Sequence, residues 1–82
     1  MRAITTFQVV DCNKELEAGA LGWRVRLHDA CGRQTLSIEP ADSRAAPTAD
    51  GEAARAAVIN FFANAGVPVE FAEDGTTFWA AG

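Results

Sequence analysis

The chain has few of the side chains that carry metal-binding or redox chemistry. Among its 82 residues there are one histidine, two cysteines and no tyrosine. The cysteines, Cys12 and Cys31, form no CxxC motif, and one imidazole with two thiols cannot assemble a zinc cluster. We therefore expect no metal and no other cofactor. We expect two free thiols, as in a reducing compartment, although strands that bring the cysteines together would allow one disulfide.

Long apolar runs are also missing. No window approaches the roughly 18 to 20 consecutive apolar residues that a membrane-spanning helix needs. The first residues, MRAITTFQVVDCNKELEAG, have only a short apolar run interrupted by Thr, Gln and Asp, which does not fit a signal peptide. These features predict a cytoplasmic protein that makes no membrane contact.

Positive charge is the scarcer sign. Seven Lys and Arg stand against eleven Asp and Glu, which gives a net charge of −4. Binding to a nucleic-acid backbone needs the opposite sign on at least one face, so direct nucleic-acid binding is not expected. Apolar residues make up 49% of the chain, an ordinary globular balance, and the length predicts a single domain over residues 1–82.

The segment from Asp50 to Gly66 is the strongest helix signal. Its apolar residues recur at helical spacing: Ala54, Val58, Phe61, Phe62 and Ala65. Thr48 or Asp50 can cap the start, and Gly66 suits the left-handed residue that follows a helix. This helix is expected to pack across one face of a sheet.

Strands are predicted before and after that helix. Ala3 to Val10 is rich in β-branched and aromatic residues, which predicts a first strand, and residues 11–21 are interpreted as a connection with at most one helical turn. Residues 22–39 predict a hairpin. A turn over residues 29–32 pairs Val25 with Leu36 and keeps apolar residues on one face, whereas a three-residue loop mixes the faces.

A second hairpin is predicted over residues 67–80. Asp74-Gly75 favours a two-residue turn that places Phe71 opposite Phe78 and Glu70 opposite Trp79. The predicted architecture is α+β, with an antiparallel sheet of about four to five strands in the order β-β-β-α-β-β and one helix across one face.

No arrangement of residues predicts catalysis. His28 and Cys31 flank the predicted tip of the first hairpin, where no pocket would exclude water. The glycines all have turn or cap roles, so no phosphate-binding loop is present. We predict that the protein is not an enzyme and has no catalytic, cofactor-binding or metal-binding residues.

The remaining candidate is a surface on the outward side of the sheet. It gathers basic and titratable side chains with one tryptophan and one glutamate: Arg24, Arg26, His28, Arg33, Trp79 and Glu70. One interpretation is a solvated sheet face balanced by Glu39 and nearby carboxylates. The other is a contact surface for an anionic partner. Trp79 is interpreted either as an interface anchor or as packed against the N-terminal strand or a loop.

The chain resembles small acidic proteins of phages and other mobile elements, including the anti-CRISPR type. The pattern consists of the hairpin GWRVRLHDACGRQTLSIEP, the helix DGEAARAAVINFFANAG and a closing β segment. The resemblance covers nearly the whole chain and implies a non-catalytic inhibitor that occupies a surface of a nucleoprotein complex. The pattern is also similar to antitoxin domains, although their Gly- and Pro-bearing strand motif is missing.

Three hypotheses follow from the sequence. The first is a non-enzymatic, protein-binding inhibitor encoded by a phage or mobile element. The second is a structural or antitoxin-like module that forms a homodimer through a sheet face or edge, with Trp79 in the contact. The third and weakest is nucleic-acid contact through Arg24, Arg26 and Arg33.

Overall fold

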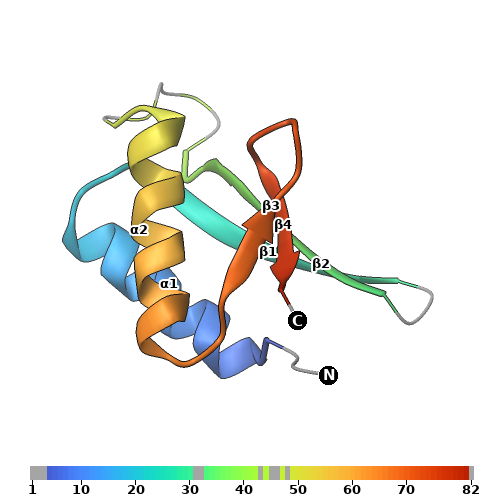
Figure 1. Ribbon diagram of the computed structural model, residues 1–82. Coiled ribbons are helices and arrows are strands. Elements are labelled where there is room, and N and C mark those ends of the chain that lie inside the picture. The colour runs from blue at the N-terminus through green and yellow to red at the C-terminus, as the bar shows by residue number, and fades with distance from the viewer. Residues whose placement is uncertain (1–3, 31–32, 43, 45–46, 48, 82) are drawn as a thin grey trace.

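The computed structural model describes residues 4–30, 33–42, 44, 47 and 49–81, with the side chains of Asp29, Ala30 and Arg33 excluded. It contains two helices and four strands: α1 (Thr6–Ala18), β1 (Trp23–Ala30), β2 (Arg33–Pro40), α2 (Gly51–Asn64), β3 (Val69–Phe71) and β4 (Thr77–Ala80). The strands form one antiparallel sheet in the order β1-β2-β4-β3. Both helices cover the same face of this sheet (Figure 1). The predicted α+β class and the antiparallel sheet are confirmed.

The prediction of a strand over Ala3–Val10 is wrong, because this segment begins helix α1. Thr5 caps the helix: its side chain accepts a hydrogen bond from the Gln8 N–H, and the Gln8 side chain accepts one from the Thr5 N–H. Residues 11–18, interpreted as a connection, continue the same helix. The molecule therefore has two helices over the sheet instead of one.

Packing explains why a β-rich composition forms a helix here. Val9, Cys12 and Leu16 are buried, and their spacing of three and four residues places them on one side of α1. β-branched composition reflects how well side chains pack on a sheet surface and does not dictate the backbone. The buried residues lie on both sides of Val10, where the predicted strand was expected to end and the predicted connection to begin.

The first hairpin keeps the predicted faces but not the predicted register. Val25 lies opposite Ile38 and Leu27 opposite Leu36, which shifts the pairing by two residues from the expected one. A shift of two residues preserves the alternation of faces, so Val25, Leu36 and Ile38 remain in the core. The strands extend to Ala30 and from Arg33, and the tip between them lies outside the described residues.

Helix α2 follows its sequence signals closely. Asp50 is the N-cap and accepts a hydrogen bond from the Ala53 N–H at 2.9 Å. Gly66 has a φ of +79°, the left-handed conformation expected just beyond the helix. Ala54, Val58 and Phe62 are fully buried, which confirms that this stripe faces the sheet.

The second hairpin has the predicted pairing. Phe71 lies opposite Phe78 and Glu70 opposite Trp79. The turn is longer than the expected two residues: the ladder pairing ends at Phe71 and Phe78, and one further bond joins the Ala72 N–H to the Thr77 carbonyl. Asp74 closes the turn by accepting hydrogen bonds from the N–H groups of Thr76 and Thr77, and these bonds lower the pKa of its carboxyl to about 2.

The core is one cluster built from both helices and the inner face of the sheet. Phe78 lies at its centre, with its ring centroid 6.1 Å from that of Phe62 and 4.8 Å from that of Phe71. Leu36, beside Phe78 on the neighbouring strand, is also fully buried. This inner face is therefore used for folding, which leaves the opposite face of the sheet and the outer sides of the helices as candidate surfaces.

Candidate interaction surfaces

The open sheet face, opposite the helices, carries the candidate residues of β1. Arg24 and Arg26 are exposed there, and both approach Glu39 on β2, at 3.0 Å and 3.7 Å. The His28 ring Nε2 lies 2.9 Å from the Ser37 hydroxyl. Arg33 belongs to this face by its place in the ladder, but its side chain lies outside the described residues.

Trp79 and Glu70 lie on the same open face. Phe78 points into the core, so its neighbour Trp79 points the other way, and the Trp79 side chain is partly buried. The register places Thr35 beside Trp79 and also opposite His28, so the row runs from Glu70 through Trp79 and Thr35 to His28. The structure thus brings the sequence-predicted residues that it describes onto one face.

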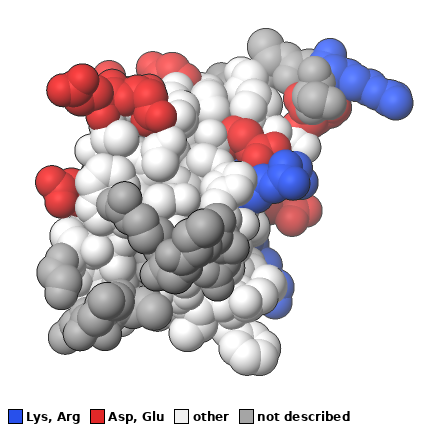
Figure 2. All heavy atoms as spheres, turned by 90° about the vertical axis from the view of Figure 1, so that its right-hand side faces the viewer, with Lys and Arg blue, Asp and Glu red and all other residues white. Residues whose placement is uncertain are grey.

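Charges on the open face largely compensate one another. Two guanidinium groups share the Glu39 carboxylate, and the hydrogen bond from Arg24 is the main reason that the pKa of Glu39 is lowered. Figure 2, a view from the right-hand side of Figure 1, shows basic side chains lying next to acidic ones. The β1–β2 part of the face therefore carries a small local excess of positive charge, and Glu70 adds a negative charge at the β3 edge, on a protein whose net charge is −4.

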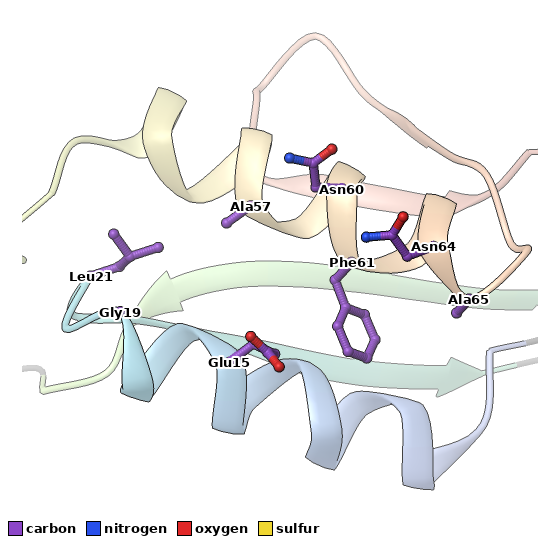
Figure 3. A pocket seen from close by; sticks show the side chains of 8 residues that line it. All are labelled: Glu15, Gly19, Leu21, Ala57, Asn60, Phe61, Asn64 and Ala65. Carbon is purple, nitrogen blue, oxygen red and sulfur yellow. The ribbon is translucent and has the colours of Figure 1, made fainter.

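A groove of about 600 Å³ separates the two helices. Phe61 extends from α2 toward α1 and forms its apolar floor with Ala57 and Leu21, while Glu15 lies across from it on α1 (Figure 3). The Phe61 ring contacts that of Phe62 edge to face, with centroids 5.0 Å apart. The sequence predicted that Phe61 packs on the sheet; it is only partly buried because it faces the second helix instead.

An apolar patch on α1 was missed by the sequence analysis. The Phe7 side chain is 83% exposed and Val10 is 46% exposed, one turn apart on the side of the helix away from its buried stripe. The interpretation of this segment as a strand hid the patch. A helical assignment would have revealed it, because Phe7 and Val10 lie outside the spacing of Val9, Cys12 and Leu16.

Two side-chain amides hold α1 on the sheet. The Asn13 Nδ2 donates to the Val25 carbonyl at 3.1 Å, and the Val25 N–H donates to Asn13 Oδ1 at 2.7 Å. Just before the start of α1, the Gln34 side chain makes the same pair of bonds with the backbone of Ile4, at 2.7 and 2.8 Å. These contacts satisfy backbone groups that neither the helix nor the sheet would satisfy.

The chemistry of the described residues is sparse. No group of three or more His, Cys, Asp or Glu side chains suited to a metal ion occurs among them, and none of their polar or charged residues is buried. Cys12 is a buried free thiol, and burial, with a smaller contribution from Glu15, raises its pKa to about 12. An activated cysteine needs the opposite shift. No helix in the described ranges is long and apolar enough to cross a membrane.

Comparisons with known proteins give no further assignment. No protein-family model, no curated protein and no solved structure matches the chain. The surfaces described above are therefore the basis for a functional proposal.

Proposed function

We propose that this chain is a non-enzymatic protein-binding module that presents its open sheet face to the acidic surface of a partner protein. One observation carries the proposal: both helices cover one face of the sheet, and the other face exposes Arg24 and Arg26 with a single shared carboxylate. On an acidic protein, such a local excess of positive charge selects a partner of opposite charge.

Trp79 supports a protein partner over a nucleic acid. It lies in the middle of the open face, in the row that leads to His28, and a partly buried tryptophan is a common anchor of protein interfaces. Affinity for a phosphate backbone requires several uncompensated cations, and Glu39 already neutralises one of the two described arginines here.

A surface of this kind can act by binding over a functional site of a partner protein and blocking it. A small rigid domain with an open face can block a surface of a host complex without chemistry, as expected of an inhibitor encoded by a phage or mobile element. The contrast between the paired, exposed arginines and the raised pKa of Cys12 supports a binding role in preference to a catalytic one.

The test compares how well two double variants of the chain capture a partner. Both variants lose two positive charges, but from different surfaces. We expect the immobilised chain to retain a specific acidic protein from an extract of the source cells, and to lose at least about tenfold of it when Arg24 and Arg26 are both replaced by Ala. Lys14→Ala with Arg44→Ala is the matched control, because it removes the same charge from exposed positions elsewhere. Equal retention by both double variants would refute the proposal.

A further inference from the structure

The groove between α1 and α2 has the dimensions of a small-ligand site. Its volume of about 600 Å³ lies within the range of ligand-binding pockets, roughly 300–1,000 Å³. Three of its lining residues, Gly19, Ala57 and Ala65, have little or no side chain, so the space between the helices is not filled. Phe61 and Leu21 give it an apolar floor (Figure 3). A ligand with an apolar body can therefore lie in the groove.

The formal charge on the groove is negative. Among the described residues that line it, Glu15 is the one charged side chain, and no Lys or Arg is present. The Glu15 carboxylate makes no hydrogen bond and no salt bridge to any other residue that the structure describes. Its charge is therefore available to a positively charged ligand.

The two helices add to the negative potential through their C-terminal ends. The C-cap residues, Gly19 of α1 and Ala65 of α2, line the groove at its opposite ends (Figure 3). A helix C-terminus carries a partial negative charge of about half an elementary charge, which a Lys or Arg in the last turn commonly offsets. Neither helix, each of which lies wholly within the described residues, has a basic residue there. A cation is thus favoured over an anion or a neutral ligand.

The lining suits an organic cation better than a metal ion. A hard metal ion needs several oxygen ligands, and no group of three or more His, Cys, Asp or Glu side chains suited to one occurs in the described part of the chain. An ammonium group needs less: the Glu15 carboxylate, the amide oxygens of Asn60 and Asn64, and the face of the Phe61 ring can all stabilise it. An ion pair at an exposed carboxylate contributes at most about fivefold to binding, so the apolar body must supply the rest.

We propose that the groove binds a small organic cation, with its apolar body on Phe61 and Leu21 and its ammonium group facing Glu15. The helices supply the negative potential, and the apolar floor excludes ligands that are only charged. This site is separate from the open sheet face, and the proposal does not rest on the proposed function.

The first test compares three probes of similar shape and different charge. Phenethylammonium is titrated into the nitrogen-15-labelled chain at constant ionic strength, and two-dimensional NMR spectra are recorded. We expect saturable shifts of the Gly19 and Phe61 amide signals with a Kd of about 1 mM, a typical affinity for a ligand of about nine non-hydrogen atoms. The neutral 2-phenylethanol should bind at least about threefold more weakly, and the anionic 3-phenylpropionate should not bind. No saturable shift below about 20 mM phenethylammonium, or equal binding of all three probes, would overturn the proposal.

The second test removes the negative charge. Glu15→Gln keeps the size of the side chain and is expected to weaken phenethylammonium binding at least about threefold, with little change for 2-phenylethanol. Glu17→Gln is the matched control, because it removes the same charge from an exposed position of the same helix that does not line this groove. Equal affinities of the two variants for phenethylammonium would show that Glu15 does not hold the cation and would overturn the proposal.

The third test removes the aromatic face. Phe61→Leu keeps an apolar side chain on the floor of the groove but loses the ring, so the preference for phenethylammonium over 2-phenylethanol should fall by at least about twofold. Unfolding curves of all the variants verify that they fold. If Phe61→Leu leaves the affinities for both probes unchanged, the ligand does not lie on the Phe61 ring and the proposal is wrong.

Discussion

The two helices of this protein cover the same face of the sheet but are held there in different ways. Helix α2 buries a stripe from Ala54 to Phe62 in the centre of the core and has a local start and stop signal at Asp50 and Gly66. Helix α1 also buries a stripe of three residues, and side-chain amide bonds hold it at Asn13, in its middle, and at Ile4, just before its start. A helix of the first kind is specified mainly by its own sequence, whereas the second depends on contacts from distant segments.

The outer sides of the two helices also differ in their contacts and in the side chains that they expose. The outer side of α2 is occupied in part by Arg55, which donates to the Gly75 carbonyl at 3.2 Å and so links the helix to the turn of the second hairpin. Gly75 has a φ of +73°, a left-handed conformation that favours glycine at this turn. The outer side of α1 exposes two large apolar side chains, Phe7 and Val10, whereas α2 exposes one, Ile59.

The largest expected effect tests which helix dominates the core. Phe62→Ala on α2 is expected to lower the free energy of unfolding by about 3–5 kcal/mol, and Leu16→Ala on α1 by about 2–4 kcal/mol, because both side chains are fully buried. Urea unfolding at one fixed protein concentration gives both values. If Leu16→Ala costs clearly more than Phe62→Ala, the assignment of α2 as the dominant helix is wrong.

A smaller effect is expected when the clamp on α1 is removed. Asn13→Ala leaves the N–H and C=O of Val25 without their partner, which should cost about 1–2 kcal/mol at this partly buried position. Asn60→Ala is the control, because Asn60 is exposed on α2, and we expect a change within about 0.5 kcal/mol. If both variants lose the same free energy of unfolding, the Asn13 bonds do not contribute to stability.

An effect on stability that appears only at alkaline pH is expected from the thiol of α1. The pKa of Cys12 is raised from 9.0 to about 12, so the folded chain holds its proton while the unfolded chain loses it above pH 9. The resulting contribution to stability is fully present below pH 9 and is lost as the pH rises toward 12. Cys12→Ala in a Cys31→Ser background should lack this alkaline loss. The comparison is made from unfolding curves between pH 8 and pH 11.

The same thiol reports local opening of α1. At pH 8 its alkylation in the folded chain should be at least about a hundredfold slower than in urea, since both burial and the raised pKa protect it. Asn13→Ala should speed the reaction if the clamp holds α1 closed. An unchanged rate would argue that the core residues of α1 suffice.

The parts of the fold that were predicted correctly have local signals. The limits of α2, the pairing of Phe71 with Phe78, and the α+β class all follow from spacing, caps and turn residues. The first hairpin was placed on the correct faces because side-chain alternation fixes the face, but its register was wrong by two residues because both registers preserve that alternation. The placement of Arg24, Arg26 and His28 on the open face follows from the same alternation.

The parts that were missed depend on distant contacts. No residue near Ile4 in the sequence indicates that the Gln34 side chain will bind its backbone. Likewise, no residue near Val25 indicates that Asn13 will bind the Val25 backbone. Without these contacts, β-branched composition favoured a strand over residues 3–10. The exposed patch at Phe7 was lost with the helix.

The sequence by itself determined helix α2, the strand faces and the scarcity of metal and redox chemistry, because these depend on spacing and composition. Only the tertiary structure decided that the N-terminal segment is a helix, that two amides clamp it, and that its outer side exposes Phe7. The physical reason is that backbone groups at a sheet edge must find partners, and the partners come from positions that only the folded chain brings together.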